Sequence, residues 1–326
     1  MLFYIFPKTD AVRNLATEEF FFLHKKEPCF LLWRNESAVI VGRNQNTLAE
    51  INTDYVRRRG ISVVRRMTGG GAVFHDLGNL NYTFISRDEP GNDIDFQTFT
   101  RPIIDALSQL GIDARLNGRN DLCIDGLKFS GNAQTRNAHG TLHHGTLLFS
   151  SNVADISGAL QVDPRKIQSK GIASVASRVT NISAHLPAPM DILQFAAFLG
   201  ERVCTGFPHT DIYEPTVEDE ALIDRLVAEK YGTWEWNYGY SPAYTHTKSQ
   251  RFSFGTVEVG LQVKDGKILS AAVRGDFFGT GEIGGLQELL VGCEHREEAL
   301  RQRLTRVELN TYIFGMTVPQ LLSLLV

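Results

Sequence analysis

Arg65-Arg66-Met67-Thr68-Gly69-Gly70-Gly71-Ala72-Val73-Phe74-His75-Asp76 is the stretch on which the interpretation of this 326-residue chain depends. Three glycines follow two arginines and an apolar run at 61–64. Glycine lacks Cβ, so its backbone can pass close to a ligand, and successive N–H groups in a turn form an anion site. The two guanidinium groups add positive charge at its edge. The stretch predicts a loop around an anionic, phosphorylated ligand, with a flexible loop or hairpin turn as the alternative.

Two common nucleotide-binding motifs are absent. The chain has no G-x-x-x-x-G-K-[ST], which excludes a P-loop, and no G-x-G-x-x-G that opens a helix with an acidic residue about 20 positions later. A phosphate site at residues 65–76 therefore belongs to another fold.

The bulk composition is that of a globular protein, with 43% hydrophobic and 21% charged residues. The net charge of −4 does not indicate a nucleic-acid partner. No apolar run reaches about 18 residues, so we expect no membrane span and a cytoplasmic location. The four cysteines show no C-x-x-C spacing and are expected to be free thiols, not a disulfide frame or zinc site; they are Cys29, Cys123, Cys204 and Cys293.

Strand and helix patterns alternate irregularly through the first part of the chain, which predicts an α+β fold with a mixed or antiparallel sheet. Short apolar runs predict strands, and longer runs with helical periodicity predict helices. The expected strands are 2–6, 29–33, 38–41, 61–65, 81–86, 121–124, 127–130 and 142–149; the expected helices are 14–26 (with Asn14 as a possible N-cap), 53–59, 96–110, 193–204 and 217–230.

The pattern restarts after about residue 245. Strands at 251–254, 256–263 and 268–273 are followed by helices at 285–291, 296–304 and 318–325. We expect a catalytic domain over 1–244 and a small α+β accessory domain over 245–326, because the latter has no dense cluster of polar chemistry and its size suits a domain.

A second polar cluster surrounds Asp125-Gly126, a strong hairpin signal. The hairpin should bring Asp121 and Lys128 near one end of a shared ladder, with Lys128 beside the close-approach residue Gly131. The alternative is a solvated surface lysine. His143 and His144 are adjacent on a strand, so they face opposite ways and at most one should reach the site.

The basic segment 162–181 is rich in small residues, which suits a loop that closes over a ligand, although an ordinary connection has the same composition.

Six motifs in order resemble the lipoate–protein ligases across essentially the whole chain. They are V-G-R-N-Q-N at 41–46, R-R-M-T-G-G-G-A-V-F-H-D at 65–76, G-R-N-D at 118–121, K-F-S-G-N-A at 128–133, H-H-G-T-L-L at 143–148 and S-K-G-I-A-S-V…S-R-V-T-N at 169–181. The resemblance implies a catalytic domain of the biotin/lipoyl-ligase type. It also implies that lipoate is first activated by ATP to lipoyl-adenylate and then transferred to a lysine of a lipoyl carrier domain.

The resemblance also implies roles for individual residues. Lys128 would lie between the lipoate carboxylate and the α-phosphate of ATP, since two reacting anions need a cation between them. The nucleotide phosphates would be held by Arg66 and the backbone of Gly70, Gly71, Ala72, Val73 and Phe74. Gly69 and Gly70 would leave room for the acyl chain or ribose. Asp121 would face Mg²⁺ or a phosphate-bound water, and His144 would contact substrate. The carriers implied are acyltransferase subunits of 2-oxoacid dehydrogenases or the glycine cleavage H protein.

Three other interpretations stay open. An ATP-independent octanoyl- or lipoyl-transferase shares the fold but needs a cysteine nucleophile, and a biotin ligase has a more arginine-rich glycine loop. A non-catalytic lipoate-binding protein would lack the lysine or arginines, which are present here. The chain departs from the family at Thr47-Leu48-Ala49-Glu50, where some members carry a lysine, so no role of that lysine is transferred.

Overall fold

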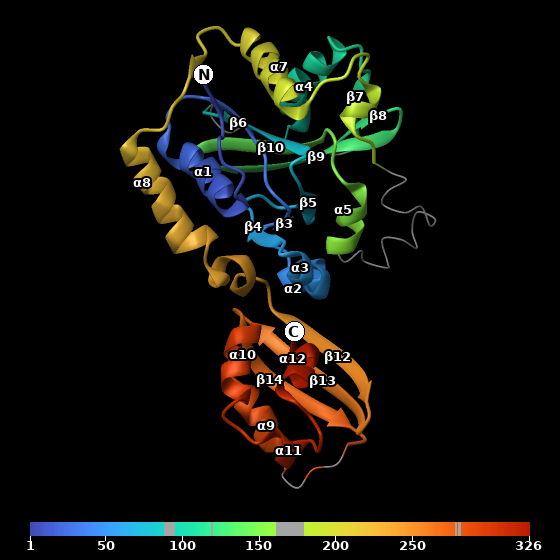
Figure 1. Ribbon diagram of the computed structural model, residues 1–326. Coiled ribbons are helices and arrows are strands. Elements are labelled where there is room, and N and C mark those ends of the chain that lie inside the picture. The colour runs from blue at the N-terminus through green and yellow to red at the C-terminus, as the bar shows by residue number, and fades with distance from the viewer. Residues whose placement is uncertain (88–94, 119, 161–178, 278, 280–281) are drawn as a thin grey trace. The chain divides into compact units, whose positions relative to one another are not determined.

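The computed structural model describes residues 1–87, 95–118, 120–160, 179–277, 279 and 282–326 (Figure 1). These residues form two compact units. The first consists of Met1–Gln45 and Glu50–Thr233, and the second consists of Asn46–Ala49 and Trp234–Val326. The division by contacts therefore falls between Thr233 and Trp234, whereas the functional boundary at 244/245 remains a prediction.

The first unit is the larger. Its strands are β1 (Leu2–Ile5), β2 (Cys29–Trp33), β3 (Ala38–Val41), β4 (Ser62–Arg65), β5 (Val73–His75), β6 (Asn79–Ser86), β7 (Ala114–Asn117), β8 (Asp121–Ile124), β9 (Leu127–Asn137), β10 (Gly140–Leu148) and β11 (Asp211–Ile212). Its helices are α1 (Ala11–His24), α3 (Thr53–Arg59), α4 (Phe96–Ser108), α5 (Val153–Ala159), η2 (Ile182–His185), α7 (Ile192–Thr205), α8 (Val217–Leu226) and η3 (Val227–Tyr231).

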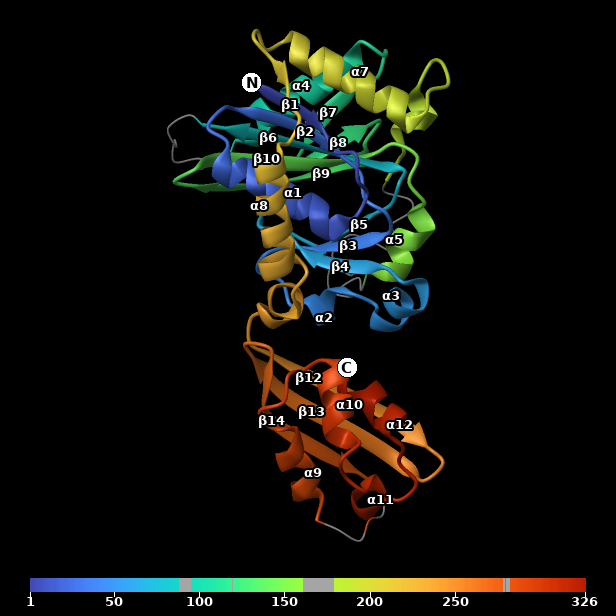
Figure 2. The same cartoon turned by 60° about the vertical axis from the view of Figure 1, so that its left-hand side comes forward.

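Eight strands form one large sheet in the order β11-β1-β2-β6-β10-β9-β8-β7. The pairs β11/β1 and β1/β2 are parallel and the others antiparallel, so the predicted mixed sheet is confirmed. Strands β4, β3 and β5 form a second, three-stranded sheet. Helices α4 and α7 cover one face of the large sheet, and α1 and the small sheet lie on the other (Figures 1 and 2).

Alternation along β6 gives the two faces of the large sheet different characters. Leu80, Tyr82 and Phe84 belong to the apolar core under α4 and α7. The residues between them, Asn81 and Thr83, are just as buried but polar, and they face the side of α1 and the small sheet because successive side chains of a strand alternate. The apolar face supplies the hydrophobic core, and the polar face is left for a site.

The Asp125-Gly126 turn is present as predicted, with positive φ at both residues, 50° and 79°. The ladder beyond it contains a β-bulge: Leu122 pairs with Ser130, but Cys123 pairs with Lys128. Phe129 is the extra residue and is buried in the core. The bulge puts Lys128 on the face of Gly131, three positions away, which a regular strand would place on the opposite face.

The predicted start of the first helix is wrong. Helix α1 begins at Ala11, and its N-cap is Asp10, whose carboxylate accepts from the N–H of Arg13 at 2.7 Å. Asn14 is buried inside the helix, where its Nδ2 donates to the carbonyls of Lys8 and Arg34. The asparagine is used for a tertiary contact that the cap signal in the sequence does not reveal.

The second unit contains α2 (Thr47–Glu50, of which Thr47–Ala49 belong to this unit), η4 (Glu235–Gly239), β12 (Tyr244–Phe252), β13 (Gly255–Lys264), β14 (Lys267–Gly275), α9 (Ile283–Leu290), α10 (Glu297–Leu304), α11 (Leu309–Tyr312) and α12 (Val318–Leu325). Its three strands form an antiparallel sheet. Every second residue of β13 points into a core that it shares with α9, α10 and α12; these residues are Val257, Val259, Leu261 and Val263. This confirms the predicted α+β character. Thr47 is held here by its Oγ1, which donates to the carbonyl of Asn237 at 2.6 Å.

The apolar face of the large sheet allows a stability test on α7. Phe195 is fully buried and stacks on Phe149 with ring centroids 4.8 Å apart, whereas Leu193 on the same helix is 61% exposed. Phe195→Ala should lower the free energy of unfolding by about 3–5 kcal/mol, and Leu193→Ala by less than about 0.5 kcal/mol. Chemical denaturation measures both; equal losses would show that α7 does not cover the core as described.

Candidate active site

A pocket of about 170 Å³ opens on the polar face of the large sheet. Its wall is formed by β5, β6, β9 and β10, by the loop of glycines, and by Leu15 of α1, Trp33 of β2 and Ile40 of β3. All of these elements belong to the first unit. The pocket combines apolar side chains with a few convergent polar groups, as small-molecule sites do.

The three glycines of the loop have different structural roles. Gly70 has φ +96°, a conformation that other residues rarely adopt. Its carbonyl lies against Gly42, where a Cβ would come within 2.0 Å of that oxygen. A Cβ on Gly69 or Gly71 would meet no atom within 4 Å. At these two positions the backbone borders open space, and Gly71 lines the pocket.

Arg66 holds the loop from inside. Its guanidinium donates to the carbonyls of Gly69 (2.7 Å), Gly71 (2.9 Å) and Ile40 (3.1 Å), and its Nε donates to Thr68 Oγ1 at 2.9 Å. Burial lowers the pKa of Arg66 to about 10, which leaves the side chain charged near pH 7. Arg66 therefore shapes the loop and brings positive charge to the pocket wall.

Arg65 does not contribute charge at the edge of the pocket as its position in the sequence suggests. It is fully buried and donates from Nη1 to the carbonyls of Gly42, Arg43 and Gln45, each within 2.9 Å. Adjacent residues at the end of β4 point to opposite sides. One arginine supports the segment 42–45, and the other supports the glycine loop.

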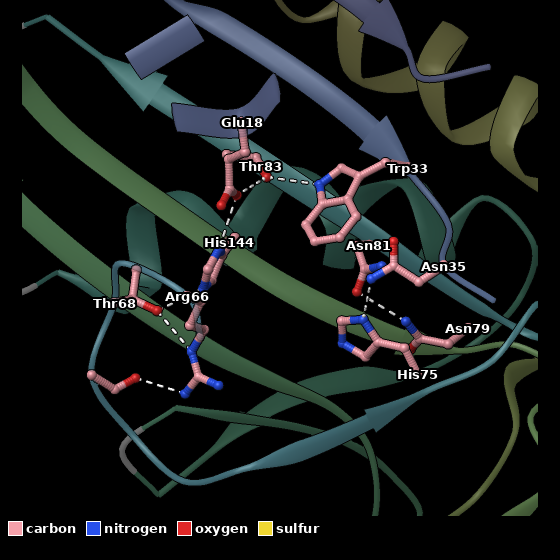
Figure 3. A network of polar contacts seen from close by, with 11 residues as sticks. Glu18, Trp33, Asn35, Arg66, Thr68, His75, Asn79, Asn81, Thr83 and His144 are labelled. Atoms are coloured by element: carbon pink, nitrogen blue, oxygen red, sulfur yellow. Dashed lines mark hydrogen bonds and ion pairs between the residues drawn. The ribbon is translucent and has the colours of Figure 1, made fainter. Parts of the chain in front are cut away.

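A chain of buried hydrogen bonds continues from Arg66 to helix α1 (Figure 3). Thr68 Oγ1 lies 2.8 Å from His144 Nε2, and His144 Nδ1 lies 2.8 Å from Glu18 Oε1. A carboxylate oxygen accepts, so His144 Nδ1 carries a proton and donates it to Glu18 Oε1, while Nε2 faces the Thr68 hydroxyl. Glu18 Oε1 also accepts from Thr83 at 2.6 Å. This network fixes the His144 ring in the pocket wall.

Lys128 and Asp121 form an ion pair near the pocket, with Nζ 2.7 Å from Oδ1. Both side chains are partly exposed, 40% and 38%, so this end of the pocket meets solvent. A Cβ on Gly131 would lie 3.1 Å from the Lys128 ammonium, so the glycine leaves the lysine room to extend. The backbone N–H of Thr180 donates to the Lys128 carbonyl at 2.9 Å.

The predicted site residues come together to different degrees. Arg66, Gly70, Gly71, Ala72, Val73, Lys128 and His144 all line the pocket. Asp121 is connected to the pocket through its ion pair with Lys128. Gly69 is connected to it through its carbonyl, which accepts from Arg66. Phe74 is buried behind the wall. His143 lies on the opposite face, stacked on Phe99 at 5.1 Å, as the strand geometry predicts. Within the loop expected at 162–181, residues 162–178 lie outside the described residues.

Several other residues of the wall were given no role from the sequence, although six of them stand in the quoted motifs. They are Leu15, Trp33, Ile40, His75, Asn81, Asn120, Asn132, Ala133, Gly145 and Thr146. Asn81 on β6 and His75 at the end of the glycine stretch were visible in the sequence as polar residues beside apolar ones. That signal identifies a site only when the face that they occupy is known.

A magnesium ion bound by protein ligands alone is not indicated in the part of the chain that the structure describes, since it contains no group of three or more His, Cys, Asp or Glu side chains placed to hold a metal. Mg²⁺ is usually held by one or two carboxylates together with substrate phosphates, and Asp121 fits that pattern. The described residues also include no helix both long and apolar enough to cross a membrane. None of the four cysteines, all free, lines the pocket.

Comparison with known proteins places the chain beside enzymes that attach lipoate. The family model "Lipoyl protein ligase A/B catalytic domain" matches residues 10–203, and "Bacterial lipoate protein ligase C-terminus" matches residues 241–325. Lipoate–protein ligase 1 of Staphylococcus aureus is 41% identical over 319 residues, and lipoate-protein ligase LplJ of Bacillus subtilis is 41% identical over 323 residues. Each match covers 97% of both chains.

Solved structures agree with these matches. A bipartite lipoate protein ligase from Thermoplasma acidophilum, described with its E2 lipoyl domain, has a TM-score of 0.64 at 30% identity and covers 73% of this chain and 96% of its own. A lipoate-protein ligase A bound with ATP has a TM-score of 0.62 at 27% identity and covers 74% and 100%. A T. acidophilum protein with bound lipoic acid has a TM-score of 0.59 at 26% identity and covers 73% and 98%.

The glycine loop allows a paired mutational test. Gly42→Ala should displace the loop because its Cβ would overlap the Gly70 carbonyl, so the melting temperature should fall. Gly71→Ala has room for its methyl group, and the protein should melt as the wild type does. The methyl group would occupy ligand space instead, weakening the affinity for ATP or lipoate roughly tenfold or more. Calorimetry with each ligand measures this; unchanged affinity for both would show that no ligand approaches Gly71.

Two buried histidines predict how stability depends on pH. Burial lowers the pKa of both His75 and His143 to about 3, below the ordinary value of 6.5. The unfolded chain therefore binds more protons below pH 6.5, and stability falls as pH falls from 6.5 toward 3. His143→Phe should reduce the loss between pH 6.5 and 5.0 by about 1.5 kcal/mol. Urea denaturation at both pH values tests this, and an identical loss in the variant would contradict a neutral buried His143.

Proposed function

This chain belongs to the lipoate–protein ligase family, and we propose that it activates lipoate with ATP to lipoyl-adenylate and transfers the lipoyl group to a lysine of a carrier domain. It is therefore an enzyme of the ligase class. The observation that carries the two-step proposal is the position of Lys128, a cation at the solvent end of the pocket and within 2.7 Å of Asp121.

The first step must bring two anions into contact. The lipoate carboxylate attacks the α-phosphorus of ATP, the bond to the pyrophosphate group breaks, and a mixed anhydride and pyrophosphate result. We assign to Lys128 the role of a point charge between the carboxylate and the α-phosphate, which holds the reactants together and stabilises the charge of the transition state. Its bond to Asp121 aims the ammonium in the absence of substrate.

The glycine loop would receive the nucleotide. The backbone of residues 70–73 borders the pocket, and the open space beside Gly71 allows a phosphate or ribose to approach the main chain. Arg66 supplies positive charge from behind the loop, since four of its N–H groups are already engaged by Thr68, Ile40, Gly69 and Gly71. Its contribution to phosphate binding is thus long-range charge and loop shape more than a direct fork.

Mg²⁺, when bound with ATP, would offset negative charge on the phosphates. Asp121 is the carboxylate placed to hold it, together with phosphate oxygens. Holding both Mg²⁺ and Lys128 would let one aspartate position the two cations of the reaction.

The second step uses the anhydride as an electrophile. A neutral lysine amine of the carrier attacks the lipoyl carbonyl, an amide forms, and AMP leaves. The intermediate must be shielded from water, and the segment 162–181 is assigned this role. Its last residues are tied to the Lys128 strand by the bond from Thr180 N–H. The carriers proposed are acyltransferase subunits of 2-oxoacid dehydrogenases or the glycine cleavage H protein, in the cytoplasm. The accessory domain at 245–326 would aid acceptor docking or closure.

One reaction tests the whole proposal. The protein is incubated with lipoate, Mg·ATP and a lipoyl carrier domain, and intact-mass spectrometry follows the carrier. We expect modification of a single lysine, with pyrophosphate released at the first step even when the carrier is omitted. Modification that proceeds from an acylated donor without ATP would replace the proposal with an acyl transferase.

The role of Lys128 is tested by Lys128→Ala. Loss of one preorganised charge at a reacting centre costs about 2.7–4 kcal/mol, so pyrophosphate release should slow by roughly 10² or more. The melting temperature should change little, because the side chain is partly exposed. The exposed Lys26 provides the matched control, and Lys26→Ala should retain full activity. A folded Lys128→Ala enzyme with near-normal pyrophosphate release would remove the lysine from the chemistry.

A further inference from the structure

Two side chains in the pocket wall, His75 and Asn81, combine deep burial with incomplete hydrogen bonding. They are only 3% and 2% exposed. His75 Nε2 and Asn81 Nδ2 have no hydrogen-bond partner among the residues that the structure describes. Buried polar atoms are nearly always paired, with protein or with ordered water, so each of these atoms is available to bond a water or a ligand group in the pocket.

The protonation of His75 follows from its neighbours (Figure 3). Asn14 Nδ2 lies within 3.0 Å of the carbonyls of Lys8 and Arg34, which can only accept, so this atom is the nitrogen. Its two hydrogens are shared among these carbonyls and the facing atom of Asn35, 2.9 Å away, which is therefore the acceptor Oδ1. Asn35 must then present Nδ2 to His75 Nδ1, 3.1 Å away. His75 accepts at Nδ1 and carries its proton on Nε2, the unpaired atom.

His75 remains neutral at physiological pH, because burial lowers its pKa to about 3. It is therefore a fixed donor of one hydrogen bond. Asn81 is less constrained. It is bonded once, to Asn79 at 2.9 Å, and whichever way the two amides are turned, one polar atom of Asn81 stays without a partner.

The charge distribution of the pocket orients an acidic ligand. Lys128 lies at the solvent end, 40% exposed, and binds the anionic end of the ligand. His75 and Asn81 are buried in the wall of the same pocket. A chain that extends inward from Lys128 can therefore reach these two residues, which line the same pocket as the apolar side chains of Leu15, Trp33 and Ile40.

We propose that His75, together with Asn81, makes the pocket prefer an acyl chain whose far end accepts hydrogen bonds, the dithiolane ring of lipoate, over the plain alkyl end of octanoate. The proposal rests on the proposed function and names the feature of the substrate that the pocket selects. Both acids have the same carboxylate and eight-carbon chain, so they differ only where His75 and Asn81 lie.

Binding octanoate leaves the Nε2–H of His75 buried without a partner, and a site built to donate a hydrogen bond discriminates against a ligand that cannot accept it. Sulfur is a weak acceptor, so the discrimination should be modest. We expect the preference for lipoate over octanoate to fall about fivefold or more when the donor is removed.

His75→Phe and Asn81→Leu remove the two groups at nearly constant volume. The matched control is His143→Phe, since His143 is also buried and neutral and also has an unpaired nitrogen, but faces the opposite side of the sheet. Calorimetry gives the ratio of the octanoate Kd to the lipoate Kd for each folded protein, and pyrophosphate release with each acid gives the corresponding ratio of kcat/KM. Circular dichroism melting identifies any variant that fails to fold.

A lowered ratio in either folded pocket variant, with the wild-type ratio in His143→Phe, supports the proposal. An unchanged ratio in the folded pocket variants, or an equal fall in the control, overturns it. Wild-type protein that releases no pyrophosphate with either acid contradicts the proposed function instead. In that case the Kd ratios still decide whether the pocket distinguishes the two chain ends.

Discussion

The hydrogen bonds from Arg66 to the carbonyls of the glycine loop shape the pocket, and much of the site depends on them. A loop of three glycines has high conformational freedom in the unfolded chain. In the folded chain the guanidinium binds Gly69 and Gly71 on either side of Gly70, and its Nε binds Thr68. One side chain thus determines the course of the backbone that faces the ligand. Because it is charged and buried, it also gives the loop a positive field that a neutral donor would not supply.

The same arginine is connected to helix α1 through Thr68, His144 and Glu18. Thr68 and Glu18 bond to the two ring nitrogens of His144, and Thr68 is itself bonded to Arg66. The orientation of the His144 ring therefore depends on all three residues. These bonds offset part of the cost of burying a carboxylate and a guanidinium in one wall. Glu18 is bonded only through Oε1, because its Oε2 is buried without a hydrogen-bond partner among the described residues.

Sequence patterns predicted most of the fold because local signals were strong. The limits of β2, β3, β8 and α12 are as expected, and the Asp125-Gly126 turn gives the expected hairpin. The short strands β5, β7 and β11 were missed because their two to four residues carry too little periodicity. Asn14 was misassigned as a cap, because a polar residue near a helix start looks the same whether it caps the helix or bonds to a distant loop.

The candidate site was predictable where residue type alone specifies chemistry, as for Lys128 and the glycine loop. The site was not predictable where the role of a residue depends on the face of the strand from which its side chain projects. Adjacent arginines diverge at the end of β4, so only Arg66 reaches the pocket. Lys128 and Gly131 are an odd number of residues apart, and a regular strand would separate them by the thickness of the sheet. The bulge at Phe129 restores them to one face.

That bulge also explains how Lys128 comes to line the pocket. The extra residue, Phe129, is buried under α4 and α7. Its packing in the hydrophobic core on one face of the sheet fixes the register of β9. That register sets the position of the Lys128 charge on the other face. Phe129 is fully buried and does not line the pocket, but a change in its volume would move Lys128 relative to Asp121 and Gly131. The packing of the apolar face and the chemistry of the polar face are thus coupled through a single residue of β9.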